Sequence, residues 1–88
     1  AHASLIRKMI ELTLFTTAGC HLCEQAQALL NQLNQQTIQV HSVDIALDDD
    51  LLEQYGQSIP VIRFPDKCEL NWPFSLQDIE TYISQQST

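Results

Sequence analysis

The sequence predicts a small α/β domain with the element order βαβαββα, in which three helices flank a four-stranded mixed sheet. The main observation is that short β-like segments alternate with segments of helical periodicity. A helical crossover between the first two strands makes them parallel. Only three residues join the last two strands, which predicts an antiparallel hairpin. With 88 residues, the chain can form one domain with a modest core.

The first strand and the first helix are the clearest elements. The strand is expected over Ile10–Phe15 and the helix from about Cys20 to Asn34. Apolar residues recur along that helix at one-turn spacing: Leu22, Ala26, Leu29, Leu30 and Leu33. Because Met9 directly precedes the strand, residues 1–8 are expected to be a tail or a remnant of expression. Residues 9–88 are expected to form the single domain.

The second strand and second helix follow. Residues 38–45 begin with alternating apolar and polar side chains, as in a strand with one solvent-exposed face. A short helix is predicted over Leu51–Tyr55, between the carboxylates of Asp48–Asp50 and Gly56. Asp50 and Glu53 have capping-box spacing. The carboxylates therefore indicate capping and solvation rather than a cation site.

The hairpin and last helix complete the order. Strands are expected at Pro60–Phe64 and Cys68–Trp72. Ser75 is expected to cap the final helix, and Phe74 to pack as a staple on Ile79.

Charge and cysteine content narrow the function classes. The net charge is −7, and residues 9–88 hold two basic and eleven acidic residues. Such a surface repels phosphate backbones, so no nucleic-acid partner is expected. No apolar run approaches the roughly 20 residues of a membrane span, so no membrane partner is expected. Three cysteines, one close pair and one distant single, are typical of a reducing compartment such as the cytoplasm.

The close pair, Cys20 and Cys23, carries the main chemical prediction. At a helix N-terminus the positive end of the helix dipole stabilises a thiolate, which is the reactive form of cysteine. Cys23 is one turn further in and can attack a mixed disulfide formed on Cys20. The alternative is a structural pair or half of a zinc site, for which only Cys68, His21 and His41 remain as further ligands. Since there is no second close pair, redox chemistry is favoured, and neither metal nor cofactor is expected.

Six other side chains are expected to have mainly structural or surface roles. Cys68 is expected to be a buried small hydrophobe. His21 is either a cation that helps to hold the thiolate or an exposed spectator. His41 is expected on the exposed strand face, and Arg63 on the plain surface. Trp72 with Phe74 is expected to be a hydrophobic lid.

The element order, with a C-x-x-C pair between the first strand and the first helix and Ile59–Pro60 before the third strand, resembles the thioredoxin fold. Three short motifs are similar to one branch of it, a small bacterial glutaredoxin-like family. They are Gly19–Glu24 with its C-x-x-C pair, Ser58–Val61, and Trp72–Phe74, and the resemblance spans residues 9 to about 84. It implies that Cys20 attacks and Cys23 resolves. It also implies a cis bond before Pro60, which faces the dithiol and leaves the backbone of Ile59 free to pair with an extended substrate.

The sequence departs from the family pattern at the positions that contact glutathione. Thr17 stands where glutaredoxins usually have a lysine, and Asn71–Phe74 replaces a Gly-Gly and acidic pattern. Leu14 stands where thioredoxins carry an aspartate. We therefore expect glutathione to be a poor partner.

Together these observations predict a thiol–disulfide oxidoreductase that acts as a monomer. Its partners would be a disulfide-containing protein or small thiol substrate and a separate, unidentified reductant. A non-catalytic metal or iron–sulfur carrier and a redox-sensing interaction domain remain as alternatives.

Overall fold

The structure is a computed structural model that describes residues 10–33 and 37–86. Its elements are β1 (Ile10–Thr16), α1 (His21–Leu30), β2 (Ile38–Asp44), the short 3-10 helix η2 (Ile45–Leu47), α2 (Asp49–Tyr55), β3 (Val61–Arg63), β4 (Glu69–Asn71) and α3 (Leu76–Ser84). The predicted order βαβαββα is confirmed. The expected tail, residues 1–8, and the expected helix end at Asn34 lie outside the described residues.

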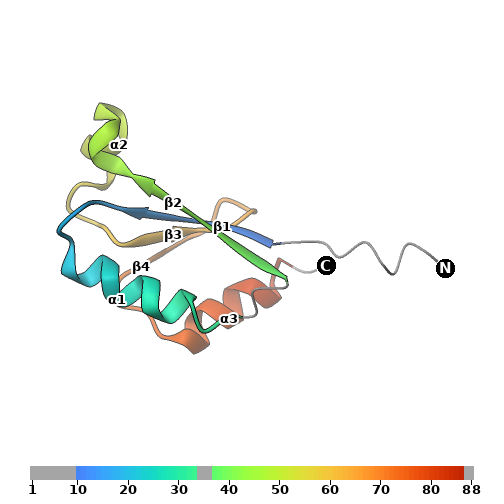
Figure 1. The fold of residues 1–88 in the computed structure, drawn as a ribbon. Helices are drawn as coiled ribbons and strands as arrows, with labels where there is room; N and C mark the ends of the chain where they lie inside the picture. Colours follow the sequence, from blue (N-terminus) through green and yellow to red (C-terminus); the bar gives the residue numbers. More distant parts are fainter. Residues whose placement is uncertain (1–9, 34–36, 87–88) are drawn as a thin grey trace.

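The strands form one mixed sheet in the order β2-β1-β3-β4 (Figure 1). β1 and β2 are parallel, with a register that runs from Ile10↔Ile38 to Thr16↔Asp44. β3 is antiparallel to both β1 and β4. The mixed sheet predicted from the helical crossover and the short hairpin connection is therefore present.

Alternation along the strands divides the core between the two sheet faces. Leu12, Leu14, Ile62 and Phe64 belong to the larger buried cluster, which includes side chains from α1 and α3. Phe15 and Val61, from the other face, pack with Ile45, Tyr55 and neighbouring apolar residues in a smaller cluster. Accordingly, α1 and α3 cover one face and α2 lies over the other (Figure 1). Full burial of each such side chain contributes about 1.5–3 kcal/mol relative to exposure.

The helix starts follow from side-chain capping. The Ser75 hydroxyl accepts the Asp78 N–H at 3.1 Å, and the Asp78 carboxylate accepts the Ser75 N–H at 2.9 Å, so the predicted cap is a complete capping box. Phe74 and Ile79 are both buried in the larger cluster, as expected for a staple.

The start of α2 differs from the prediction. The Asp48 carboxylate accepts the N–H groups of Asp50 and Leu51 at 2.9 and 3.3 Å, so Asp48 is the N-cap and the helix begins two residues earlier than expected. The 3-10 helix η2, which the sequence analysis missed, is capped in the same way by Asp44, whose side chain accepts the Ala46 N–H.

Among the described residues, no helix has the length and apolar character needed to cross a membrane.

Candidate active site

A tight turn carries the chain from β1 into α1. The Cys20 N–H donates to the Thr17 carbonyl at 3.3 Å, which closes a four-residue turn. Gly19, its third residue, has φ +80°, the left-handed conformation that a type II turn requires at that position. A Cβ on Gly19 would meet no atom within 4 Å, so backbone conformation and not crowding favours glycine there.

This turn makes Cys20 the N-cap residue of α1. The Cys23 N–H donates to Cys20 Sγ at 3.1 Å, in the position where a Ser or Asp oxygen usually accepts. The two cysteines are joined by a disulfide with Cα atoms 5.2 Å apart. Cys20 is half-buried, whereas Cys23 is only 4% exposed. A reagent from solvent therefore reaches Cys20 more readily than Cys23.

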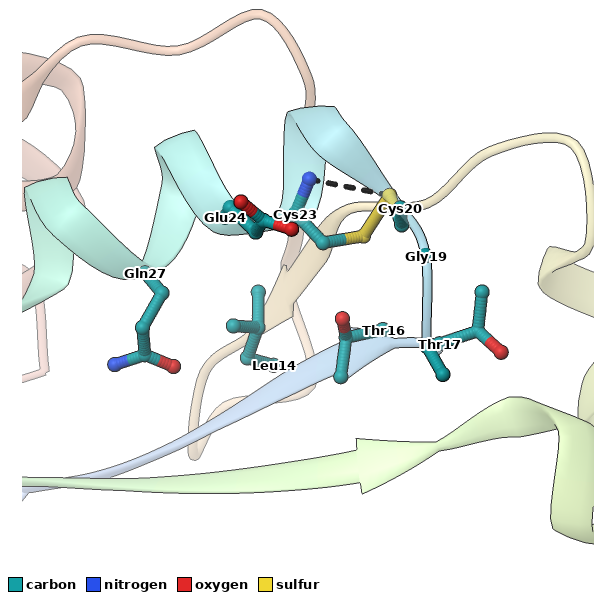
Figure 2. Close-up of a pocket in the computed structure, with 9 residues that line it drawn as sticks. Leu14, Thr16, Thr17, Gly19, Cys20, Cys23, Glu24 and Gln27 are labelled. Carbon is teal, nitrogen blue, oxygen red and sulfur yellow. Dashed lines mark hydrogen bonds between the residues drawn. A yellow bond between two sulfur atoms is a disulfide. The ribbon is translucent and has the colours of Figure 1, made fainter.

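A hollow of about 240 Å³ opens beside the disulfide (Figure 2). The end of β1 and the following turn form one wall, and α1 forms the other. These walls present Leu14, Thr16 and Thr17 on the β1 side and Cys23, Glu24 and Gln27 on the α1 side. Cys20 lies where the two walls meet, so a molecule seated in the hollow is next to the sulfur atoms.

Ile59 and Pro60 lie at the same end of the sheet. The register Phe15↔Val61 places the residues before β3 next to the end of β1 that leads into Cys20. In Figure 1 the connection from α2 to β3 and the connection from β1 to α1 lie at the same end of the molecule. The Ile59–Pro60 bond is cis, as predicted. Neither residue is among those that line the hollow.

The backbone of Ile59 is less free than the resemblance implied. Its N–H donates to the Tyr55 carbonyl at 3.2 Å, because the chain continues from α2 in a helix-like turn. Its carbonyl accepts no hydrogen bond within residues 10–33 and 37–86. The carbonyl of Pro60 accepts the Trp72 N–H at 3.3 Å. An extended partner would thus find an acceptor on Ile59 but no free donor.

The prediction for Cys68 is wrong, because this side chain is exposed. β4 begins only at Glu69, so Cys68 remains in the turn, where its N–H donates to the Asp66 carboxylate at 3.0 Å. A hydrogen bond from the thiol to the same carboxylate raises the pKa of Cys68 above its ordinary value.

The histidines and the late aromatics follow the expectations more closely. His21 is exposed between the two cysteines. His41 is exposed on β2, with Nε2 2.9 Å from the Glu11 carboxylate, as expected for the solvent-facing side of a strand. The rings of Trp72 and Phe74 meet edge to face with their centroids 5.0 Å apart. Phe74 belongs to the larger cluster and Trp72 packs against it, as expected for a hydrophobic lid. The cis bond between Trp72 and Pro73 was not predicted.

Sequence reasoning missed a polar cluster on the face of the sheet that α2 covers, formed by Tyr55, Arg63 and Glu69. The Tyr55 hydroxyl donates to the Glu69 carboxylate and accepts from Arg63 Nη2 at 2.7 Å. Arg63 also pairs with Glu69 at 3.1 Å and lies over the Phe15 ring. The hairpin offered a signal, since Arg63 and Glu69 are equally far from its central residue and are register partners. This cluster anchors the end of α2 to the sheet, just before Ile59.

Within the described ranges, no three His, Cys, Asp or Glu side chains gather in a way that could hold a metal ion.

A disulfide at the start of the first helix, at the end of a β2-β1-β3-β4 sheet flanked by three helices, defines a thioredoxin-fold domain of the redox type. The family model for the glutaredoxin-like domain (DUF836) matches residues 11–84, and the chain belongs to this family.

Solved structures agree with this assignment. The chain is similar to the Northeast Structural Genomics target protein XcR50 from X. campestris. Its X-ray structure has a TM-score of 0.75 at 36% identity over 84% of this chain and 96% of that one. The solution structure of the same target gives a TM-score of 0.72 at 36% identity over 84% and 92%. A structure described as a malarial protein shares only the fold, with a TM-score of 0.71 at 16% identity over 92% and 100%. No match is found among curated proteins.

Proposed function

We propose that this protein is a thiol–disulfide oxidoreductase that reduces or exchanges disulfides in protein substrates. One observation carries the proposal: the N–H of Cys23 points at Cys20 Sγ at the first turn of α1. After reduction, the same N–H and the helix dipole stabilise a thiolate on Cys20, the more accessible sulfur. Membership of the glutaredoxin-like family supports the same chemistry.

The reaction would proceed in two exchanges. The Cys20 thiolate attacks one sulfur of the substrate disulfide, and the other substrate sulfur leaves with the electron pair and takes a proton from solvent. Cys23, deprotonated to solvent, then attacks Cys20 Sγ and releases the second substrate sulfur as a thiol. The substrate gains two electrons and the protein becomes the Cys20–Cys23 disulfide. An external thiol reductant returns both cysteines to the thiol form.

Ile59 and Pro60 are proposed to dock the substrate backbone. The Ile59 carbonyl is the acceptor available for an extended chain, since its N–H is bonded to Tyr55. We place the protein in the reducing cytoplasm on the cysteine usage of the chain, and we propose that it acts as a monomer.

Trapping of the mixed disulfide tests this function. In Cys23→Ser the resolving thiol is missing, so the substrate should remain bound to Cys20. The exposed Cys68 must be replaced by serine in every variant, because it could form disulfides of its own. The control is Cys20→Ser in the same background, which retains the buried Cys23.

The expected result is a set of protein adducts on Cys23→Ser that a thiol reductant releases and that Cys20→Ser lacks. Equal adducts on both variants, or none on either, would contradict the proposed roles.

A further inference from the structure

The hollow beside the disulfide has the size and position of a substrate subsite. Its volume of about 240 Å³ is far above the ~10–15 Å³ that one water needs, so it has room for a side chain. The disulfide forms one end of it and Gln27 the other (Figure 2). A residue next to the reacting cysteine of a substrate would therefore come within reach of its walls.

The polar groups of the hollow favour a cation. Glu24 contributes a carboxylate from α1, while Thr16 and Thr17 contribute hydroxyl groups from the opposite wall. The register Thr16↔Asp44 puts Asp44 beside this wall, but its carboxylate accepts the Ala46 N–H as the cap of η2. Among the residues that line the hollow, Glu24 is therefore the one that carries a charge. No Lys or Arg occurs between Met9 and Ile62, so the segments that form the hollow contain neither. His21, between the two cysteines, is exposed and is not among the residues that line the hollow.

We propose that this hollow binds a lysine or arginine side chain next to the disulfide of a protein substrate, with Glu24 as the residue that determines this preference. The inference rests on the proposed function and names the substrate class for it. It also gives a physical reason for the expected poor use of glutathione, because glutathione would bring its carboxylates toward the carboxylate of Glu24.

The expected effect is modest because Glu24 is exposed. Exposed ion pairs contribute little, so one carboxylate should change the rate by about two- to fivefold. The effect should also shrink as salt increases and the Debye length falls from about 30 Å at 0.01 M to about 3 Å at 1 M.

The test uses short peptides joined in pairs by one disulfide, with Arg, Gln or Glu next to the cysteine. Each is mixed with the reduced Cys68→Ser protein, and formation of the Cys20–Cys23 disulfide gives a rate constant. Reduction of the same peptides by dithiothreitol, a neutral dithiol, corrects for their intrinsic reactivity. Oxidised glutathione serves as an additional anionic substrate.

The corrected rate should be highest for the Arg peptide and lowest for the Glu peptide and glutathione. Glu24→Gln should reduce the Arg-over-Glu ratio by about two- to fivefold, and Gln27→Glu should increase it by a similar factor. Glu80→Gln removes one exposed carboxylate on α3, outside the hollow, and should leave the ratio unchanged.

Each outcome decides a different point. If the peptides are reduced but their ratio is the same in the parent, Glu24→Gln and Gln27→Glu, the subsite is wrong and the proposed function stands. If glutathione reacts as fast as the Arg peptide, the subsite is also wrong. If no peptide is reduced, the proposed function fails and the subsite fails with it.

Discussion

Replacement of Tyr55 by phenylalanine tests whether the cluster of Tyr55, Arg63 and Glu69 holds α2 on the sheet. The Tyr55 ring is 3% exposed and stacks on Phe15 with centroids 4.3 Å apart, a contact that phenylalanine retains. The hydroxyl group alone is lost. With it go its hydrogen bond to the Glu69 carboxylate and the one it accepts from Arg63.

The size of the expected loss in folding stability follows from the two hydrogen bonds and from the exposure of their partners. Hydrogen bonds to charged groups contribute roughly 1.5–3 kcal/mol. The Arg63 and Glu69 side chains are 41% and 30% exposed. In the variant they keep their direct contact with each other and can bind water, so part of the lost hydrogen-bond energy is recovered. We expect the free energy of unfolding to fall by about 1–2 kcal/mol, with Tm lower by about 4–16 °C at the usual 4–8 °C per kcal/mol.

Urea unfolding of Tyr55→Phe and of Tyr82→Phe measures this difference. Tyr82 is half-buried and packs on Phe64, but its hydroxyl has no partner among the described residues. The control should therefore change stability by no more than about 0.5 kcal/mol. Equal losses in the two variants would refute the anchoring role of the hydroxyl.

The same variant has a predictable pH dependence. Burial, and then the hydrogen bond to Glu69, raise the pKa of Tyr55 above its ordinary value of about 10. The folded protein thus holds this proton more tightly than the unfolded chain. The stability that comes from this raised pKa is fully present below about pH 10, the pKa of tyrosine in the unfolded chain. It is lost as the pH rises through the higher pKa of Tyr55 in the folded protein. The stability gap between the parent and Tyr55→Phe should narrow above about pH 10, and a gap that widens there would contradict the reasoning.

Two further predictions concern the start of α1. After reduction, Cys20 should be alkylated faster than Cys68 at neutral pH, with a midpoint below about 8.5, because an N–H faces its sulfur while Asp66 raises the pKa of Cys68. Mass-resolved labelling at a series of pH values measures this, and faster labelling of Cys68 would oppose it. Gly19→Ala should cost about 1–2 kcal/mol in urea unfolding, since φ is +80° there. Gly19→Asn should cost less, and equal costs would show that conformation is not the reason for glycine.

The sequence alone determined the order of the main helices and strands and the place of the dithiol, although it did not predict η2. Local rules act within a few residues: apolar periodicity defines α1, and Ser75 with Asp78 forms the cap of α3. The position of Cys20 at the start of α1 also follows from such local signals. The mixed sheet follows from connection lengths, because a short hairpin and a helical crossover each allow one strand direction.

Only the tertiary structure decided which groups from distant segments meet. Cys68 was expected to be buried because cysteine usually is. Its actual exposure depends on where β4 begins: the strand starts at Glu69, so the Cys68 side chain stays in the turn, outside the sheet. The sequence predicted Arg63 to be a plain surface residue, but the packing of α2 on the sheet brings the Tyr55 hydroxyl within hydrogen-bond distance of its guanidinium group. The hollow likewise exists only because α1 packs across the end of β1. Strand register and helix packing are non-local, so residue type and spacing along the chain cannot supply them.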